Sequence, residues 1–369
     1  MNPIPATGSS ALTLVMDPHD DAAHTHTALA AHHPLSGRIT LHPGPGTTSD
    51  TALAHDLLAA LGRPPLLPGR FPTGRQPAWE AATAWVTALP VSRLTVLRAH
   101  RLTHRRTERL LQLRAVTGLH LTLVCHRSYL PTALHQALST VDHMVITGLT
   151  AARRHYDAPL APLHTPAADP AQPSGRWLTL PALDRLISYD SPAPCTTRCT
   201  PPPIVWNHRS PPPALTPRTA REAARRLSAA TAHPRLAAAL AAALFTGASF
   251  QQLATARPCD YDDATITLAL HDRTRYIDGC AAHPVPGWAH VFLKAAACFA
   301  RLAPGQNQQL LAAPGDRPHL LRLAEMARLR PPQPPAARQG RIVWDWREQR
   351  EAGLYDAMLA PRGKPPTER

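Results

Sequence analysis

The sequence predicts an α/β N-terminal domain with a mostly parallel sheet, followed by a mainly α C-terminal domain with a small β-hairpin. Three observations lead to this fold class. Short apolar runs alternate with helical patterns over residues 36–157, prolines cluster over residues 158–215, and helical patterns dominate residues 216–330. A chain of 369 residues has room for two domains. Strands that alternate with helices require right-handed crossovers, so we expect helices on both faces of the first sheet.

The N-terminal domain is expected to contain alternating strands and helices. The apolar runs typical of buried strands are Gly37–His42, Arg93–Ala99, Leu119–Cys125 and Val141–Ile146. The helical patterns between and around them are Thr51–Leu61, Pro77–Leu89, Thr103–Val116 and Pro131–Leu138. Gly118 follows the third of these helices, where a left-handed C-cap is common.

The C-terminal domain begins with a helix start signal. Thr216 is suited to cap a helix whose first residue is Pro217. Gly247 is expected to end the helix that follows. The other helices are expected at Pro234–Phe245, Trp288–Leu302 and Pro318–Leu329, and the two strands of the hairpin at Ala264–His271 and Arg273–Cys280.

Three segments lack sustained periodicity. Residues 1–35 include a histidine-rich piece and are interpreted as a mobile arm. Residues 158–215 are interpreted as a linker, because clustered prolines are incompatible with helices and with most strands. An apolar patch within this linker, Trp177–Ile187, is expected to dock on a neighbouring domain. Residues 331–369 form a C-terminal tail that opens with further prolines.

The chain is strongly basic, with a formal net charge of +14 and a pI of about 10.5. A charge of this size favours contact with polyanions, among which nucleic acid is a common partner. Lys294 and Lys364 are the only lysines, so nearly all of the cationic side chains are arginines. Because arginine codons are GC-rich, genome composition is the alternative explanation for part of the excess.

Arginines concentrate on two of the expected helices. Arg221 and Arg225 stand four residues apart, so they share one face of a helix. Such a face neutralises DNA phosphates without reading the base sequence. The residues expected to bind DNA are Arg101, Arg105, Arg106, Arg109, Arg218, Arg221 and Arg225. The alternative for each cluster is a solvated surface helix.

The segment Leu240–Leu268 resembles the first active-site box of the tyrosine recombinases of the phage-integrase type. In that family a helix ends in Thr-Gly-Ala-Arg, and a second short helix leads through an aspartate into a strand. This chain reads Thr-Gly-Ala-Ser, with Ser249 at the arginine position, and continues through Arg257 and Asp260. Loss of a preorganised cation at the scissile phosphate costs about 10²–10³ in rate. The resemblance therefore implies the recombinase fold with an incomplete active site.

The same resemblance extends to four residues nearer the C-terminus. Residues 319–322 have the His-x-x-Arg form of the family, and a tryptophan and a tyrosine follow at suitable intervals. The catalytic set that the resemblance implies is His319, Arg322, Trp346 and Tyr355. We expect this set to be inactive without an arginine at position 249. On the hairpin, Arg273 or Arg275 stands nearest the family's lysine, but arginine holds its proton too tightly to act as a general acid.

Residues 38–62 resemble the phosphate-binding region of the AAA-type P-loop ATPases that accompany transposition, because a Gly-Pro-Gly-Thr loop stands between a strand and a helix. Thr48, Ser49 and Asp50 replace the family's Gly-Lys-Thr, so the lysine that neutralises phosphate charge is missing. Leu97 and Arg98 stand where two acidic residues of the family are expected. The resemblance implies a degenerate domain without ATP hydrolysis, and a simple turn is the alternative interpretation.

No cofactor and no metal site are expected. Cys195, Cys199 and His208 are near one another in the sequence, but a single C-x₃-C pair matches structural zinc sites poorly. The longest apolar run, residues 236–245, is too short to span a bilayer. The first residues lack a basic stretch followed by an apolar one. We therefore expect a cytoplasmic protein that has no membrane partner.

Together these patterns predict a DNA-binding accessory or regulatory protein of a recombination or mobile-element system that does not cut DNA. Proteins of the same system are further candidate partners. An active tyrosine recombinase with a rearranged site is one alternative. A protein scaffold without enzymatic activity, whose charge reflects codon usage, is another.

Overall fold

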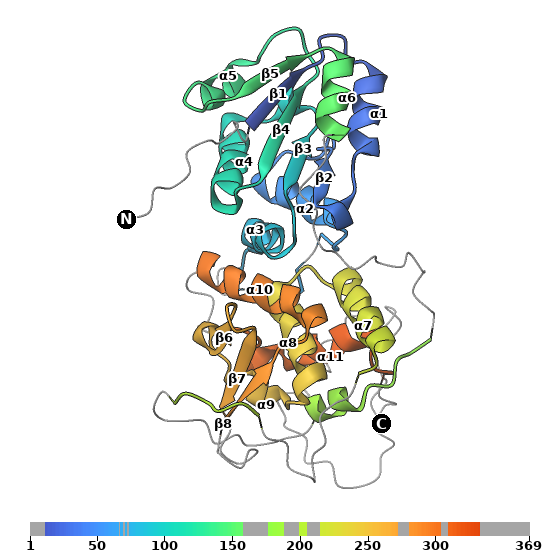
Figure 1. Ribbon diagram of the computed structural model, residues 1–369, viewed down its shortest axis with the longest axis vertical. Helices are drawn as coiled ribbons and strands as arrows, with labels where there is room; N and C mark the ends of the chain where they lie inside the picture. Colours follow the sequence, from blue (N-terminus) through green and yellow to red (C-terminus); the bar gives the residue numbers. More distant parts are fainter. Residues whose placement is uncertain are drawn as a thin grey trace, which may run out of the picture. The chain divides into compact units, whose positions relative to one another are not determined.

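The N-terminal region is a five-stranded, all-parallel sheet with helices, and the C-terminal region is mostly helical with a three-stranded antiparallel sheet (Figure 1). This is the predicted fold class. The computed structural model describes residues 12–65, 67–68, 71, 74–157, 176–187, 199–204, 215–271, 280–303 and 309–332.

The parallel sheet has the strand order β2-β3-β4-β1-β5. Its strands are β1 (Leu12–Met16), β2 (Arg38–Leu41), β3 (Arg93–Val96), β4 (His120–Cys125) and β5 (Met144–Thr147). The adjacent inner strands β1 and β4 run in register from the pair Leu12–Leu121 to the pair Met16–Cys125, and β3 is the third inner strand. Their residues are almost all buried, as expected for parallel strands that are covered on both faces.

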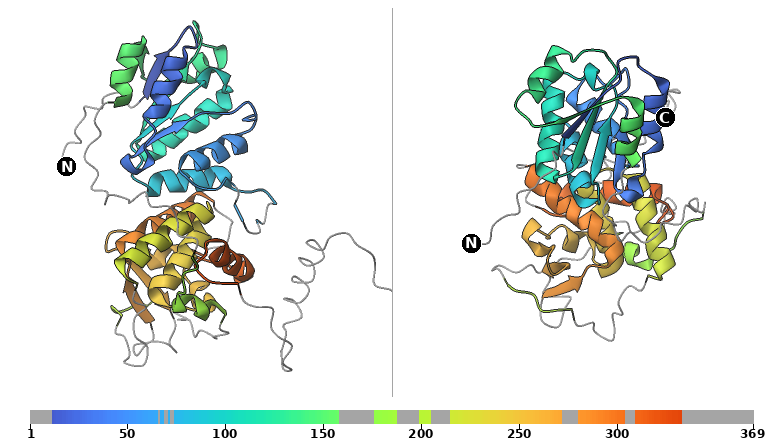
Figure 2. Two further views of the ribbon diagram at one scale, coloured as in Figure 1. Left: turned by 90° about the vertical axis from the view of Figure 1, so that its right-hand side faces the viewer. Right: turned by 45° about the horizontal axis from the view of Figure 1, so that its top comes forward.

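The helices of this region cover both faces of the sheet. They are α1 (Ala22–Ala30), α2 (Asp50–Ala60), α3 (Ala78–Ala88), α4 (His104–Thr117), α5 (Thr132–Leu138) and α6 (Leu149–Asp157). On one face α1 packs against α6, and on the other α2 packs against α3 and α4 against α5 (Figure 2). Gly118 ends α4 with a φ of 71°, which confirms the predicted left-handed cap.

The prediction of a mobile arm over residues 1–35 is wrong for residues 12–35. Leu12–Met16 forms the strand β1 inside the sheet, and Ala22–Ala30 forms α1, whose N-cap is Asp21. The strand was missed because five consecutive apolar-to-neutral residues show no alternation, although such a run is what a strand buried on both faces requires. Residues 1–11 lie outside the described residues.

The C-terminal region is built around one buried helix. Its helices are η3 (Pro181–Ile187), α7 (Pro217–Ala230), α8 (Pro234–Thr246), α9 (Phe250–Leu253), α10 (Gly287–Leu302) and α11 (Arg317–Met326). Nearly every residue of α8 is buried, because the helix is apolar on all sides. Thr216 caps α7 by accepting a hydrogen bond from the Thr219 amide, and Gly247 ends α8 in the left-handed conformation, both as predicted.

The antiparallel sheet contains the predicted hairpin, with shifted bounds. Its strands are β6 (Tyr261–Asp262), β7 (Thr267–His271) and β8 (Cys280–Pro284), in the order β6-β7-β8. The second strand of the hairpin therefore begins at Cys280, where the prediction ended it. Residues 272–279, which include Arg273 and Arg275, lie outside the described residues. The remaining short helical turns are η1 (Pro34–Ser36), η2 (Ala99–Arg101), η4 (Pro258–Asp260) and η5 (Pro314–Asp316).

The two regions share one hydrophobic core. Helix α3 is buried on both sides and packs against α10 of the C-terminal region as well as against α2. The Trp85 indole on α3 donates a hydrogen bond to the carbonyl of Ala232, at 2.7 Å. The guanidinium of Arg63 stacks over the Trp85 ring, 3.4 Å from its centroid. The described residues up to 331 accordingly belong to one compact unit.

Parts of the Pro-rich segment are ordered against the C-terminal region. The predicted apolar patch contains η3, which packs on α8 and places Leu183 and Leu186 in the core. Arg317 of α11 donates to the carbonyls of Leu186 and Ile187. The docking of this patch is therefore confirmed for residues 176–187. None of the helices in the described part of the chain is long and apolar enough to cross a membrane.

Candidate nucleic-acid interface

Helix α4 carries the first of the two predicted arginine clusters. The helix begins just after β3, at the carboxyl edge of the sheet, where Thr103 accepts a hydrogen bond from the Arg106 amide. Arg105 lies 2.8 Å from a carboxylate oxygen of Asp50, the first residue of α2, and Arg109 lies 4.0 Å from the same atom. This cluster therefore faces a carboxylate supplied by another helix.

Arg106 also contacts the segment just before α2. Its guanidinium donates to the carbonyl of Thr47, at 2.9 Å, and to the carbonyl of Thr48. These bonds attach the loop before α2 to the start of α4. Arg101, in η2, is exposed and has no carboxylate within ion-pair distance among the described residues. Of the four predicted DNA contacts in this cluster, three are thus engaged by the loop and by Asp50.

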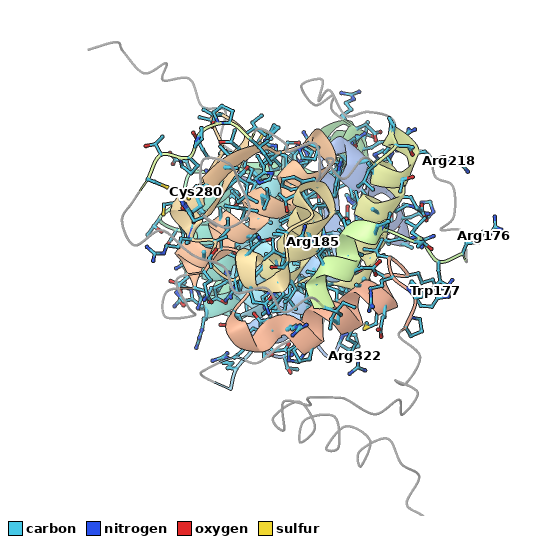
Figure 3. The ribbon with its side chains drawn as sticks, turned by 90° about the horizontal axis from the view of Figure 1, so that it is seen from below. Arg176, Trp177, Arg185, Arg218, Cys280 and Arg322 are labelled. Atoms are coloured by element: carbon cyan, nitrogen blue, oxygen red, sulfur yellow. The ribbon has the colours of Figure 1, made fainter. Side chains whose placement is uncertain are left out.

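Helix α7 carries the second cluster. Its fourteen residues begin at Pro217, and its first turn contains no acidic residue. Arg218 and Arg221 are both exposed, and neither has a carboxylate partner among the residues that the structure describes. Among the described residues, the Arg221 guanidinium donates to the carbonyl of Pro217, at 3.4 Å. Figure 3 shows Arg218 at the outer end of the helix.

The second half of α7 has a different role. Glu222 pairs with Arg225 and with Arg226, the latter at 2.6 Å. Arg226 is buried and also donates to the carbonyl of Arg328, so it anchors α7 to the end of α11. Burial raises the pKa of the Glu222 carboxyl, but the hydrogen bonds from the two arginines outweigh that effect and lower the pKa below its ordinary value. Arg225, one of the predicted contacts, therefore shares a single carboxylate with Arg226.

The Gly-Pro-Gly-Thr loop lies at one edge of the sheet. It follows β2, which is the outermost strand, and is closed by the Thr47 hydroxyl on Asp56 and by Ser49, which caps α2. In open α/β sheets, ligands bind where the chain leaves neighbouring strands toward opposite faces. That place is between β1 and β4 here, because α1 and α5 lie on opposite faces. The loop is therefore separated from this position by two strands.

Charged side chains do converge at the point between β1 and β4. His126, after β4, contacts Asp17, after β1, through its Nδ1 at 2.7 Å, and Asp20 at 3.3 Å. Asp20 in turn pairs with Arg98 at 3.0 Å, and the hydrogen bond from Arg98 lowers the pKa of Asp20. Arg98 and the buried Leu97 thus stand where the P-loop resemblance expects magnesium-binding acids.

An imidazole oriented by a carboxylate is a common acid–base pair, but this one is closed to substrates. The His126 side chain is fully buried, and its Nε2 has no hydrogen-bond partner among the described residues. His100 accepts a hydrogen bond from the His126 amide, and burial lowers the pKa of His100 to about 4. The arrangement therefore ties the loops after β1 and β4 together.

Ser249 stands at the position where the recombinase resemblance expects an arginine. It is completely buried and caps the short helix α9. Its hydroxyl accepts from the Gln252 amide, and the Gln252 side chain accepts from the Ser249 amide at 2.8 Å. An arginine here would bury a cation and remove the cap, so Ser249→Arg is expected to destabilise the fold by more than about 1 kcal/mol.

The other residues of the implied catalytic set do not join Ser249 within the described structure. His319 and Arg322 lie on α11, whose first turn meets the start of α8 through Asp316 and Arg235, 3.6 Å apart. Ser249 lies beyond the opposite end of α8, a helix of 13 residues that spans about 20 Å. Arg322 is exposed (Figure 3). Trp346 and Tyr355 lie outside the described residues.

Sequence reasoning missed the residues that the fold brings together over long separations. Asp17, Asp20 and His126 form one such group, and Cys199, His271 and Cys280 form another. The first group follows from the strand β1, whose apolar run followed by Asp-Pro-His-Asp was available as a signal. No spacing in the sequence signals the second group, since Cys199 precedes His271 by 72 residues.

In comparisons with known proteins, no protein-family model matches the chain, and neither a curated protein nor a solved structure was found to match it. Its resemblances to recombinases and to P-loop ATPases therefore rest on the motifs quoted above, and its function is inferred from its own surface.

Proposed function

We propose that the protein binds duplex DNA without cutting it, as an accessory or regulatory component of a recombination or mobile-element system. The observation that carries the proposal is the exposed pair Arg218 and Arg221 at the start of α7, which no described carboxylate neutralises. This pair belongs to a chain with a net charge of +14.

Helix polarity adds to the attraction. The first turn of a helix carries a partial positive charge, so arginine in that turn is electrostatically unfavourable for the isolated helix. At α7 the Arg218 guanidinium adds to the helix dipole without an acidic residue in the same turn. A phosphate group bound there would neutralise the guanidinium of Arg218 and the partial positive charge of the helix end. Helix N-termini are common phosphate sites because of that partial charge.

The absence of cutting is supported by the surroundings of Ser249. This side chain is buried in a helix cap, where its hydroxyl accepts from the Gln252 amide. His319 and Arg322 lie on α11, whose first turn meets the end of α8 farthest from Ser249, so these two residues of the implied set do not join this box. Binding through α7 requires none of these groups.

The test is fluorescence anisotropy of a labelled random duplex, titrated with the full chain over a series of salt concentrations. We expect a dissociation constant near micromolar at physiological salt, with a log–log salt slope that corresponds to several neutralised phosphates. Arg218→Ala combined with Arg221→Ala should weaken binding about tenfold. The same pair of substitutions should reduce the slope by about 2.

Arg153→Ala combined with Arg154→Ala is the matched control, because both residues are exposed on α6 and their removal changes the net charge equally. This control should leave affinity nearly unchanged. Equal losses for the two double variants would show that only overall charge matters. No binding at low salt would favour the protein scaffold, and relaxation of a supercoiled plasmid by the purified chain would favour an active recombinase.

A further inference from the structure

A cysteine from the Pro-rich segment is held against the hairpin β7–β8. Residues 202–204 run beside β8, where the Ala282 amide donates to the Pro202 carbonyl at 2.8 Å and the Ile204 amide donates to the Ala282 carbonyl at 3.0 Å. This short parallel pairing extends the small sheet by one strand-like segment. It places Cys199, just upstream, at the end of the hairpin where β7 stops and β8 starts.

Two residues of the hairpin face each other at that same end. His271 is the last residue of β7, Cys280 is the first of β8, and the two are directly paired in the antiparallel register. Figure 3 labels Cys280 at this end of the small sheet. The donor atoms of Cys199, His271 and Cys280 all lie within 4.8 Å of one another.

The separations suit a tetrahedral metal. The Cys199 sulfur lies 3.3 Å from the Nδ1 of His271. In a tetrahedral zinc site, with bonds of about 2.3 Å to sulfur and about 2.0 Å to nitrogen, these two atoms stand about 3.6 Å apart. Small side-chain adjustments would therefore bring all three donors to bonding distance. A set of two thiols and one imidazole selects zinc over hard cations such as magnesium or calcium.

The second nitrogen of the imidazole supplies an independent observation. His271 Nε2 lies 3.2 Å from a carboxylate oxygen of Asp260. A histidine that donates its Nε2 proton to a carboxylate keeps the lone pair of Nδ1 available, and metal-binding histidines are usually oriented in this way. Asp260 is itself held in place, because its other oxygen accepts from the Arg257 amide at 2.7 Å.

We propose that Cys199, His271 and Cys280 bind a zinc ion that fastens the Pro-rich segment to the hairpin β7–β8, with Asp260 as the positioning residue for His271. The proposal is independent of DNA binding. A tetrahedral zinc ion takes a fourth ligand, which is either water or a donor from outside the described residues. We expect the role of the ion to be structural. Its donors come from the Pro-rich segment, the end of β7 and the start of β8, and backbone pairing alone joins these segments at few positions, so metal binding would add to folding stability.

Zinc content and cobalt spectroscopy of the full, untagged chain test the site. We expect about one zinc per chain after gel filtration in a weak chelator, and a thiolate-to-cobalt charge-transfer band when cobalt replaces zinc. Cobalt bound by histidines alone lacks this band, so adventitious binding near the N-terminal histidines is distinguished. Cys199→Ser leaves Cys280 as the one thiolate of the three-residue set, so it should weaken cobalt binding and reduce the band by at least half, and because Cys199 is exposed the substitution should leave the core intact.

Cys259→Ser is the matched control, since Cys259 is an exposed cysteine beside Asp260 that lies outside the three-residue set. It should retain both zinc and the cobalt band. Asp260→Asn should weaken zinc binding about 10–100-fold while the band keeps its position. The proposal is overturned by a chain that binds no zinc and shows no band, by a band of unchanged intensity in Cys199→Ser, or by a disulfide between Cys199 and Cys280 in non-reducing mass spectrometry.

Discussion

The arginines of α4 and those of α7 are equally prominent in the sequence, but they meet different partners in the fold. On α4, Asp50 faces Arg105 and Arg109, and loop carbonyls accept from Arg106. On α7, a carboxylate appears only in the second turn, where Glu222 pairs with two arginines, and the first turn stays unneutralised. The same residue type thus fastens a loop in one helix and leaves an exposed cationic end in the other.

The difference arises from segments that are remote in sequence. Arg106 reaches carbonyls that lie 58 and 59 residues before it, whereas Glu222 is three and four residues from its partners. Spacing along a helix predicts which residues share a face, and it predicts pairs within that helix. It carries no information about acceptors that the tertiary fold delivers. The following predictions alter one partner at a time.

Removing the carboxylate of α7 should have the largest effect. Glu222→Ala removes the carboxylate that pairs with the buried Arg226, so the free energy of unfolding should fall by about 3 kcal/mol. Urea unfolding measures this change. Arg225→Ala removes only the more exposed half of the network and should cost less than about 1 kcal/mol. Equal effects of the two substitutions would contradict the assignment of Arg226 as the anchor.

Removing the loop contact of α4 should have a smaller effect. Arg106→Ala deletes the bonds to Thr47 and Thr48, and the expected loss is about 1–2 kcal/mol of unfolding free energy. Arg101→Ala, at an exposed position nearby, should change stability by less than about 0.5 kcal/mol. DNA affinity should change little in Arg106→Ala. A loss of affinity as large as that of the Arg218 and Arg221 pair would place α4 in the interface.

Asp50→Asn should make the arginines of α4 resemble those at the start of α7, which have no described carboxylate partner. Arg105 and Arg109 would lose their carboxylate partner, and Arg105 is already 70% exposed, so DNA affinity is expected to rise about threefold. Anisotropy at fixed salt measures this gain. Adding Arg105→Ala and Arg109→Ala should remove it. The triple variant carries less positive charge than the wild type, so a gain that survives these substitutions cannot come from overall charge and would mean that Arg105 and Arg109 are not the cations that Asp50 neutralises.

Much of the fold follows from residue patterns, whereas the candidate sites follow only in part. Apolar runs predicted β2, β3 and β4 within a few residues, and Thr216, Gly118 and Gly247 were correctly identified as caps because capping depends on local chemistry. The strand β1 was missed because burial on both faces removes alternation. The candidate DNA-binding arginines were predicted from charge, but the pairing of Arg105 and Arg109 with Asp50 depends on tertiary geometry, whereas the Glu222 pairs follow from spacing within one helix.

The cysteine–histidine cluster illustrates the same limit more strongly. Sequence proximity grouped Cys199 with Cys195 and His208, both of which lie outside the described residues. The fold instead groups Cys199 with His271 and Cys280, because backbone pairing at Ala282 brings the Pro-rich segment to the hairpin. A site assembled from segments some 70 to 80 positions apart has no characteristic spacing, so only the fold reveals it.

The smallest expected effect is on the pH dependence of the unfolding free energy, to which the Glu222 carboxyl of α7 contributes. The hydrogen bonds of Arg225 and Arg226 outweigh burial and hold the pKa of Glu222 below its ordinary value of 4.5. A carboxyl with a lowered folded-state pKa stabilises the fold above its unfolded pKa, and this contribution is lost as the pH falls through the folded-state value. The difference in unfolding free energy between the wild type and Glu222→Gln should therefore be constant at neutral pH and shrink below about pH 4.5. A difference that stays constant down to pH 3 would mean that the anchoring of α7 depends on the shape of this side chain and not on its charge, and the contrast between the two helices would then be one of packing.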